Sequence, residues 1–345
     1  MKLLVSALEP SSNLHLKEVL KYTNDVELLG IYDKNLVDEQ PLHDISQLAI
    51  MGVVDAIKKL RWFFKVADEM VELAKDADKV LLMDSSGFNL PLAKKIKKKY
   101  PNKEIIYYIL PQIWTSRPKR AKKLELYCDK LLGILPFEVD FYPNKKAKYI
   151  GHPLLDEITL KHNSNSNTIA FMPGSRRAEI DSLLPIFKQV RQKLQDKNAI
   201  LIIPSSFSEE KIANLYGDIS MFEVSKNTHE SLAKSEFAFI CSGTATLESA
   251  LIGTPFTLSY IAKKVDFFIG TKLLNIKQIG LANIILSNYN QTTLHNELLQ
   301  EDVTVENLLQ EYHNTDKKIF AKKAKELREY LGHGSSKGVS EVLMA

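Results

Sequence analysis

Small and hydroxyl residues follow the apolar segment 237–241 in a pattern that suits phosphate chemistry. The segment FAFIC leads directly into Ser242, Gly243 and Thr244, and Glu248 comes one helical turn later. A helix that begins with small residues binds phosphate through its free N–H groups and its dipole. A carboxylate one turn away can accept hydrogen bonds from ribose hydroxyls. The segment therefore predicts a nucleotide-binding turn, with an ordinary helix start as the alternative.

A second apolar segment, 169–172, ends in a loop that carries glycine and arginine. IAFM is followed by a proline and then by Gly174, Ser175, Arg176 and Arg177. Glycine lets the backbone approach a ligand, and an arginine fork suits a diphosphate. The loop therefore predicts a diphosphate site on the same sheet edge as the first turn. A surface loop with solvated arginines is the alternative.

Carboxylates follow two strand-like segments in the first half of the chain. Asp84 comes directly after the apolar KVLLM, and Asn89 begins the next helical pattern. Glu9 and Ser11 follow the first apolar segment, KLLVSAL. A carboxylate at a strand end acts as a general base or caps the turn, and both roles stay open for Asp84. The glycines of a dinucleotide-binding fingerprint are missing after KLLVSAL, which disfavours a nicotinamide enzyme.

Aromatic and basic residues are neighbours in the segment 111–123. Trp114 precedes Arg117 and Arg120, a combination that fits an amphiphilic anionic ligand or a membrane surface. It fits equally a core tryptophan beside a solvated helix. The lysine-rich run 94–103 is interpreted either as a solvated helix face or as a contact for an anionic ligand or lipid surface. The two cysteines are far apart and match no zinc spacing, so we expect no metal site and no disulfide framework.

The elements that would position these residues alternate along nearly the whole chain. Short apolar runs and helical patterns succeed one another, which is typical of βαβ units, so the expected fold class is α/β. The longest helical pattern covers 52–76, and the polar interval 156–168 predicts a linker. We expect domains at 1–160 and 161–317. A C-terminal helix at about 318–345 would pack back on the first domain or on a partner chain.

Hydrophobic content and net charge exclude several classes of protein. The 345 residues are 45% hydrophobic, enough for two packed domains, and no segment approaches the ~20 apolar residues that span a bilayer. We therefore expect neither a signal peptide nor a membrane span, and a cytoplasmic protein. The net charge of +4 is mild for this length and disfavours a dedicated nucleic-acid binder.

Taken together in this order, the motifs resemble those of the lipid-A-disaccharide synthase family, glycosyltransferase family 19. The segments that carry the resemblance are LAIMGVVDAI, LLMDSSGFN, YYILPQIWTSRPKR, LLGILPFEVDFY, YIGHPLLD, FMPGSRRAEI, SGTATLESAL and GLANIIL. The resemblance implies the GT-B fold, in which two doubly wound Rossmann-like domains face a central cleft. It also implies an acceptor and acyl-chain domain at the N-terminus and a UDP-sugar domain at the C-terminus.

The resemblance implies an inverting transfer of 2,3-diacylglucosamine from UDP to 2,3-diacylglucosamine 1-phosphate, which yields a β-1′,6-linked disaccharide and UDP. By the same resemblance, Asp84 is the candidate base and Arg176 stabilises the departing UDP, with no metal needed. The other residues expected at the nucleotide are Gly174, Ser175, Ser242, Gly243, Thr244 and Glu248. Those expected at the acceptor or lipid are Glu9, Ser11, Asn89, Trp114, Arg117 and Arg120. The family also implies a peripheral protein at the inner face of the cytoplasmic membrane, and a homodimer through the C-terminal segment.

The sequence departs from the family pattern mainly in its first half. The family's Gly-Glu-x-Ser-Gly-Asp reads Leu-Glu-Pro-Ser-Ser-Asn at 8–13, and Gly87 and Ser116 replace an aspartate and an aromatic residue. Acyl-chain length and linkage therefore do not follow from the sequence. Two alternatives remain: a UDP-N-acetylglucosamine 2-epimerase, which would share the sheets and the nucleotide turn, and a non-catalytic nucleotide- or nucleic-acid-binding protein.

Overall fold

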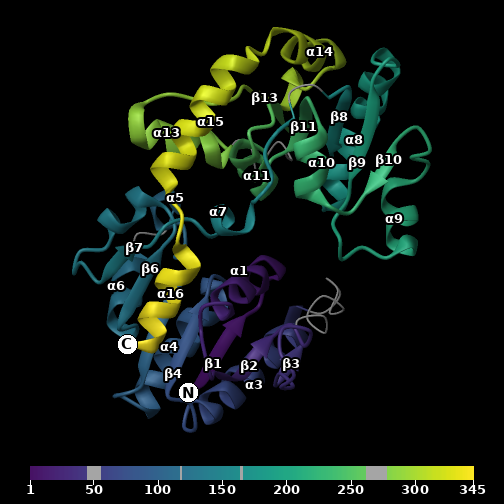
Figure 1. Ribbon diagram of the computed structural model, residues 1–345. Coiled ribbons are helices and arrows are strands. Elements are labelled where there is room, and N and C mark those ends of the chain that lie inside the picture. The colour runs from purple at the N-terminus through teal and green to yellow at the C-terminus, as the bar shows by residue number, and fades with distance from the viewer. Residues whose placement is uncertain (45–55, 117–118, 164–165, 262–277) are drawn as a thin grey trace. The chain divides into compact units, whose positions relative to one another are not determined.

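The computed structural model describes residues 1–44, 56–116, 119–163, 166–261 and 278–345 (Figure 1). These residues form two compact units. Unit 1 comprises Met1–Glu157 and Leu331–Ala345, and unit 2 comprises Ile158–Tyr330. The sequence-based boundary was three residues later, at 160. Each unit is an α/β layer structure with its own parallel sheet, so the predicted fold class is confirmed.

Unit 1 is built on seven parallel strands in the order β3-β2-β1-β4-β5-β6-β7. The strands are β1 (Lys2–Ala7), β2 (Glu27–Tyr32), β3 (His43–Asp44), β4 (Lys79–Met83), β5 (Glu104–Tyr108), β6 (Lys130–Gly133) and β7 (Ala147–Tyr149). The helices are α1 (Pro10–Leu20), α3 (Ala56–Leu73), α4 (Ser86–Lys99), α5 (Ile113–Ser116), α6 (Lys119–Tyr127), the 3₁₀ helix η1 (Pro136–Phe141), α7 (Pro153–Glu157) and α16 (Ser335–Met344).

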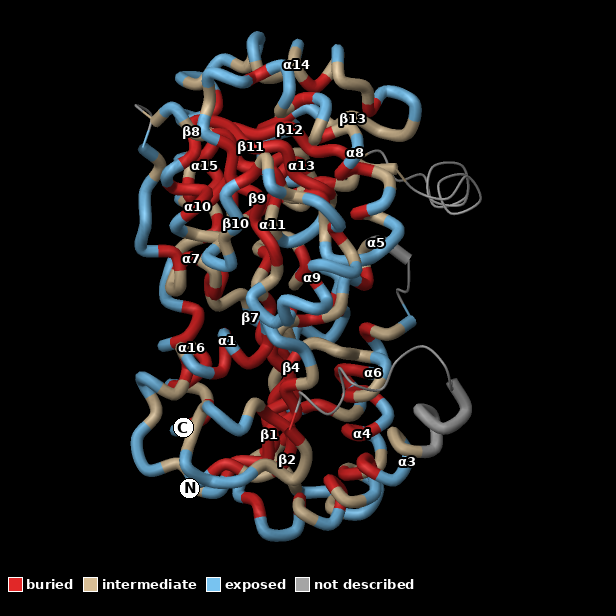
Figure 2. The backbone as a smooth tube through the Cα atoms, turned by 90° about the vertical axis from the view of Figure 1, so that its right-hand side faces the viewer, coloured by how far each residue is buried: buried red, intermediate tan, exposed pale blue. Residues whose placement is uncertain are grey.

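The central strands of unit 1 are buried on both faces, which explains their continuous apolar sequences (Figure 2). Successive side chains of a strand point to opposite faces. Leu4 therefore packs with α3 and α4, whereas Leu3 and Val5 pack with α1 and α16.

Unit 2 has six parallel strands in the order β10-β9-β8-β11-β12-β13. The strands are β8 (Thr168–Met172), β9 (Asn198–Ile202), β10 (Glu223–Ser225), β11 (Phe237–Cys241), β12 (Phe256–Tyr260) and β13 (Glu297–Leu299). The helices are α8 (Arg177–Lys193), α9 (Glu209–Tyr216), α10 (Thr228–Lys234), α11 (Thr244–Ile252), α13 (Leu281–Asn290), the 3₁₀ helix η3 (Gln300–Asp302), α14 (Val305–Asn314) and α15 (Lys317–Leu331). Phe171, Phe187 and Phe239 form the aromatic centre of its core.

The interval expected as a free linker, 156–168, is partly ordered by its neighbours. Its first two residues complete α7. Further on, the backbone N–H of His162 donates to Ile252 O (3.2 Å) and that of Asn163 to Ala233 O (2.8 Å). These bonds fasten the segment to the helices α10 and α11 of unit 2, because polar backbone groups beside a core need partners.

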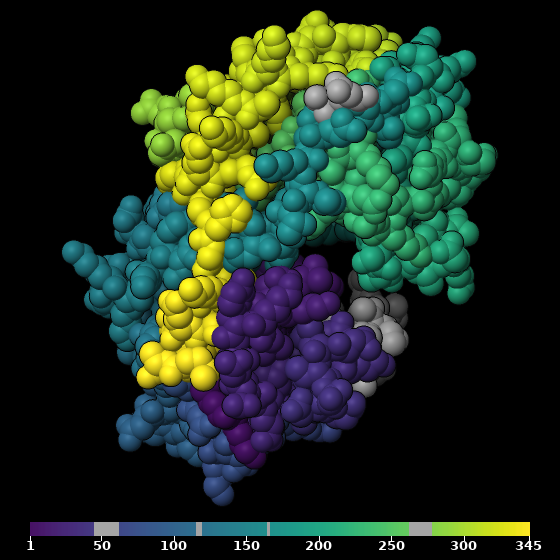
Figure 3. Space-filling view, in the orientation of Figure 1, coloured from purple at the N-terminus to yellow at the C-terminus, as the bar shows by residue number. Residues whose placement is uncertain are grey.

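The C-terminal tail consists of two helices in different units. Nearly all of α15 belongs to unit 2, whereas α16 packs on α1 and α7 of unit 1. Figure 3 shows the yellow surface of the C-terminal end against the purple surface of the N-terminal residues. Val339 and Leu343 of α16 are fully buried. The Asp156 carboxylate accepts hydrogen bonds from Gly334 N and Ser336 N, both 2.8 Å, and so caps the start of α16. No helix in the described part of the chain is long and apolar enough to cross a membrane.

We expect Asp156→Ala to lower the free energy of unfolding by about 1–2 kcal/mol, because two N–H groups at the start of α16 lose their acceptor. Denaturant unfolding followed by circular dichroism measures this change. Asp38→Ala, at an exposed position of the same unit, is the matched control and should be neutral. Equal effects of the two substitutions would contradict the capping role.

Candidate active site

Each sheet has a point at which its strand order reverses. In unit 1 the reversal lies between β1 and β4, and in unit 2 between β8 and β11. Ligands of open α/β sheets bind outside the carboxyl ends of the strands at such a point, where the loops diverge. Glu9 and Ser11 follow β1, Asp84 and Asn89 follow β4, and the residues expected at the nucleotide follow β8 and β11, so each unit carries one candidate region. Trp114, Arg117 and Arg120 come after β5 instead.

The loop after β4 places Asp84 in an uncommon backbone conformation. Asp84 and Ser85 have φ values of 49° and 34°, a region that non-glycine residues rarely adopt. The peptide is held there on both sides. Asp84 N donates to Tyr108 O (3.0 Å), and Asp84 O accepts from Asn89 Nδ2 (3.0 Å) and from the Tyr107 hydroxyl. The fold therefore fixes where the Asp84 carboxyl leaves the sheet.

Asn89 is fully buried and ties this loop to the neighbouring strand. Its amide donates to Met83 O (2.9 Å) as well as to Asp84 O, and its Oδ1 accepts from Ser6 Oγ (2.6 Å) on β1. The sequence indicated Asn89 as an acceptor contact. In the structure its hydrogen bonds brace the loop, and contact with a ligand stays a prediction.

The Asp84 carboxyl has a raised pKa. Burial is the main cause, and a backbone hydrogen bond from Ser85 and the charge of His15 oppose it. A general base needs a proton affinity above that of an ordinary carboxylate, so this environment suits the predicted role. Glu9 is exposed beside it and accepts from Ser85 Oγ (3.2 Å), while Ser11 is exposed in the first turn of α1.

Arg120 is brought to the same loop, because its Nη1 donates to Ser86 Oγ (2.7 Å) at the start of α4. Trp114 is half-buried and packs edge-on against Phe137, with ring centroids 5.3 Å apart. Its indole Nε1 has no hydrogen-bond partner among the described residues. Arg117 lies outside the described residues. The structure thus places one of the two predicted arginines near Asp84.

In unit 2, a carboxylate organises the loop after β8. Glu179 Oε2 accepts from Ser175 N (3.1 Å) and Arg176 N (3.2 Å), and Glu179 Oε1 accepts from Arg176 Nη1 (2.8 Å). Gly174 has φ 107°, and a Cβ there would lie 2.5 Å from Glu179 Oε2. The side chain of Arg176 is 81% exposed. The guanidinium is therefore anchored by one nitrogen and open to solvent at the sheet edge.

Sequence reasoning missed two residues that shape this loop. Glu179 stands three residues after Arg176, the spacing of a capping box, and this signal could have identified it. The Tyr216 hydroxyl donates to Gly174 O (3.0 Å) from the end of α9, a contact that no local pattern shows.

The turn after β11 adjoins this loop, because β8 and β11 pair with Met172 opposite Ile240. Gly243 and Thr244 are exposed at the start of α11, and the Thr246 hydroxyl donates back to Gly243 O (2.8 Å). The predicted turn and the predicted arginine loop therefore lie side by side on one sheet edge. A helix N-terminus next to an exposed guanidinium suits an anionic group such as a diphosphate.

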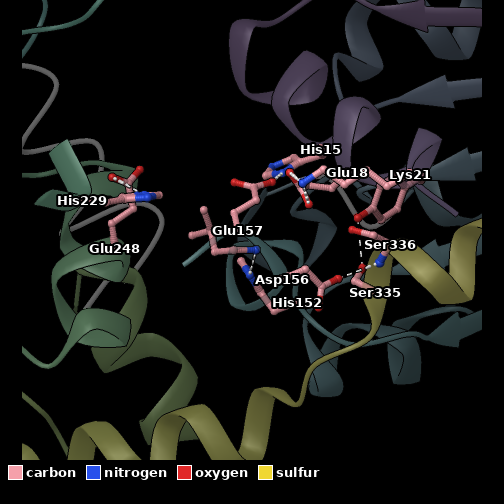
Figure 4. Close-up of polar contacts among 12 residues, drawn as sticks. His15, Glu18, Lys21, His152, Asp156, Glu157, His229, Glu248, Ser335 and Ser336 are labelled. Carbon is pink, nitrogen blue, oxygen red and sulfur yellow. Dashed lines mark hydrogen bonds and ion pairs between the residues drawn. The ribbon is translucent and has the colours of Figure 1, made fainter. Parts of the chain in front are cut away.

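Glu248 lies one turn into α11 and faces a histidine that the sequence did not indicate. Its Oε2 is 3.6 Å from His229 Nε2 on α10 (Figure 4). Both side chains are partly exposed, at 18% and 30%. The carboxylate is thus oriented at the edge of the turn and accessible to a ligand hydroxyl.

Comparison with known proteins identifies the family. A family profile described as lipid-A-disaccharide synthetase matches residues 3–343. The chain belongs to this family. The lipid-A-disaccharide synthase of Helicobacter pylori strain J99 is 49% identical over 353 residues, which cover 98% of this chain and 97% of that protein. The synthase of Campylobacter jejuni strain RM1221 is 45% identical, covering 99% and 98%.

Solved structures with the same fold include transferases and epimerases. A UDP-GlcNAc 2-epimerase from Neisseria meningitidis bound to UDP-GlcNAc covers 100% of both chains with a TM-score of 0.64 and 11% identity. The glycotransferase of kitacinnamycin covers 99% of this chain and 97% of its own, with a TM-score of 0.58 and 14% identity. At these identities the likeness shows the GT-B fold alone.

The chain is therefore a glycosyltransferase of lipid A synthesis, as the resemblance implied. The epimerase alternative shares the architecture, but the near-half identity over almost the full length lies with the synthases. Membership of this family also implies a sugar nucleotide and an acceptor as substrates.

We expect Gly174→Ala to weaken UDP binding by about tenfold or more, because the new Cβ would displace Glu179 and with it the Arg176 loop. Isothermal titration of UDP into the protein measures the loss. Gly334→Ala is a matched control, since Gly334 also has a positive φ, 95°, but a Cβ there meets nothing within 4 Å. Unchanged UDP affinity in Gly174→Ala would remove this loop from the nucleotide site.

Proposed function

We propose that the protein transfers 2,3-diacylglucosamine from its UDP donor to the 6-hydroxyl of 2,3-diacylglucosamine 1-phosphate. The products are the β-1′,6-linked disaccharide 1-phosphate and UDP. The observation that carries this proposal is the sequence similarity to the synthases over nearly the full length. The exposed Arg176 and the N-terminus of α11, both at the carboxyl ends of the strands of unit 2, agree with it.

Unit 2 would bind the nucleotide. The free N–H groups of α11 and the guanidinium of Arg176 would offset the charge of the departing diphosphate, and Glu248 would accept from the ribose hydroxyls. Protein groups rather than a metal ion carry that charge in this proposal. Ser175 and Ser242 border the same edge and would contact the phosphates.

Unit 1 would supply the base. In an inverting transfer, the acceptor oxygen forms a bond to the anomeric carbon as the bond from that carbon to the diphosphate breaks. The hydroxyl proton would pass to the Asp84 carboxylate, whose burial-raised pKa strengthens it as an acceptor. Arg120, beside Ser86, supplies a positive charge for the acceptor's phosphate. Glu9, Ser11, Asn89, Trp114 and Arg117 complete the predicted acceptor region.

We expect Asp84→Asn to lower kcat by about 10²–10⁴-fold while UDP affinity is retained, since only the proton acceptor is lost. Arg176→Ala should lower kcat by about 10²–10³-fold and weaken UDP binding, because charge on the leaving group goes uncompensated. A UDP-release assay with and without the diacylglucosamine 1-phosphate acceptor, combined with detection of the disaccharide, measures both effects.

The matched controls are Asp76→Asn and Arg177→Ala, at exposed positions outside the predicted roles. Arg177 is adjacent to Arg176, and its only described partner is Asn214 (3.4 Å). If transfer survives Asp84→Asn, the base must be reassigned, with Glu9 the next candidate. If UDP binds but the acceptor never accelerates its release, the synthase reaction with these substrates is wrong.

We also propose that the protein binds peripherally to the inner face of the cytoplasmic membrane. Phe64 on α3, Leu126 on α6 and Phe141 in η1 are exposed at 54%, 68% and 47%. The lysine-rich run contributes less than its charge suggests, because Lys95 pairs with Asp68 at 2.6 Å and lies 5.7 Å from the Phe64 ring. Apolar contact would therefore carry much of the binding.

Phe64→Glu should reduce co-sedimentation with anionic phospholipid vesicles by about threefold or more, since it replaces an exposed ring with a charge that the surface repels. Val224→Glu, at an exposed position of the edge strand β10 in unit 2, is the control. Equal sedimentation of both variants and the unaltered protein would contradict a role for α3.

A homodimer through the C-terminal segment remains part of the proposal. In a single chain α16 already covers α1. In an exchanged dimer, α16 of one copy would cover α1 of the other copy. The same apolar side chains would then be buried as in the single chain.

A further inference from the structure

One carboxylate contacts both the backbone and the guanidinium of the loop that is proposed to hold the diphosphate. Glu179 lies in the first turn of α8, and its Oε1 accepts from Arg176 Nη1 (2.8 Å). Its Oε2 accepts from Ser175 N (3.1 Å) and Arg176 N (3.2 Å). Helix capping explains the two backbone bonds. It does not explain why a negative charge lies against the guanidinium that should bind an anion.

The Glu179 carboxylate is fixed in this place. Its side chain is 11% exposed, and a Cβ added to Gly174 would lie 2.5 Å from Oε2, so the carboxylate packs against the Gly174 backbone. The Tyr216 hydroxyl holds that backbone from α9 by donating to Gly174 O (3.0 Å). Moving the carboxylate away would cost the N–H groups of Ser175 and Arg176 their acceptor. A ligand at Arg176 therefore meets a guanidinium that already has one anion beside it.

The contact between Glu179 and the guanidinium adds little to stability. The Arg176 side chain is 81% exposed, and water screens an ion pair of this kind. The described partner of the adjacent Arg177 is the neutral amide of Asn214, at 3.4 Å. The main effect of Glu179 on Arg176 is therefore electrostatic, because it offsets part of the positive charge that the loop offers to a ligand.

The proposed reaction changes the charge of the group that Arg176 would bind. In the UDP-sugar donor, the terminal phosphate is a diester with one negative charge. When the bond from the anomeric carbon to the diphosphate oxygen breaks, its electron pair stays on that oxygen, and the acceptor oxygen bonds to the carbon. The terminal phosphate is then a monoester, whose second pKa of about 6 gives it nearly two charges at pH 7. A fixed carboxylate therefore repels the product more strongly than the donor.

We propose that Glu179 is a positioning residue that orients the Arg176 guanidinium and promotes the release of UDP. It holds Nη1, leaves the other guanidinium nitrogens to the diphosphate, and weakens the binding of the more highly charged product. The inference rests on the proposed role of Arg176 at the diphosphate. The alternative is a glutamate that only caps α8, and this alternative predicts no selectivity between UDP and its sugar esters.

The first experiment measures dissociation constants by isothermal titration, with UDP as the product and UDP-N-acetylglucosamine as a soluble sugar ester without acyl chains. In Glu179→Gln, the amide oxygen can still accept from the backbone, but the negative charge is gone. We expect the dissociation constant of UDP to fall roughly threefold, an effect typical of an exposed ion pair, and that of the sugar ester to fall less. Stopped-flow displacement of UDP should show that slower release accounts for most of the change.

The control is Glu209→Gln, which removes the same charge from the first turn of α9 in the same unit. Glu209 also pairs with a cation at 2.8 Å, Lys226, and its substitution should alter neither dissociation constant. Equal changes for UDP and the sugar ester in Glu179→Gln, or no change, overturn the proposal. Weaker binding of UDP also overturns it, because the loss of a helix cap alone would have that effect.

The second experiment does not depend on the folding of Glu179→Gln. In protein labelled with ¹³C-glutamate, the carboxyl resonance of Glu179 is identified by its absence in Glu179→Asp, a substitution that keeps an acid at the start of α8. We expect UDP to shift this resonance more than UDP-N-acetylglucosamine does, because the additional charge acts on the guanidinium that Glu179 shares. A resonance that neither ligand moves, or that both move equally, contradicts the proposal.

The outcomes distinguish this inference from the proposed function. If Arg176→Ala leaves UDP affinity unchanged, the arginine is not at the nucleotide and both are wrong. If Arg176→Ala weakens UDP binding but Glu179→Gln affects UDP and the sugar ester alike, the nucleotide site stands and the inference is wrong. If Glu179→Gln selectively tightens UDP binding but the acceptor never accelerates UDP release, the inference stands and the transfer reaction is wrong.

Discussion

Where a parallel strand leaves its sheet, its backbone N–H and C=O groups no longer have hydrogen-bond partners on the neighbouring strand. Both candidate regions depend on side chains that supply these missing hydrogen bonds. In unit 1 the buried amide of Asn89 supplies two donors to the carbonyls of Met83 and Asp84. In unit 2 the carboxylate of Glu179 accepts from the N–H groups of Ser175 and Arg176. In each case the side chain comes from the first turn of the following helix, so helix and loop are fixed together.

This arrangement holds both loops mainly through their backbone groups. The Asp84 loop is held through its backbone, and the Arg176 loop through its backbone and one guanidinium nitrogen. Positioned but accessible groups are what electrostatic stabilisation requires, because they need not reorganise as charge moves. The left-handed backbone at Asp84 and Ser85 costs free energy that the Asn89, Tyr107 and Tyr108 contacts must offset.

Much of the fold could be predicted because central parallel strands are apolar on both faces. No pattern in the sequence predicts β3 or β13, because these strands have only two and three residues and form by pairing with a neighbouring strand. Asp84 and Arg176 were found because they directly follow strands. His15 and Glu157 are 142 residues apart, so their contact arises from the packing of α1 on α7 and leaves no local pattern. The helix predicted over 52–76 is observed as α3, and its first residues lie outside the described ranges.

The structure explains one departure from the family pattern after β1. Where the family has aspartate, this chain has Asn13, which is buried and fully engaged. Its Nδ2 donates to Ala7 O (2.8 Å) and Glu9 O (2.9 Å), and its Oδ1 accepts from Asp33 N (2.7 Å). An aspartate could accept from Asp33 N but, when ionised, could not donate to either carbonyl. The Asn13 amide thus stabilises the loop after β1, as the Asn89 amide stabilises the loop after β4. The altered motif therefore keeps the backbone at Glu9 ordered.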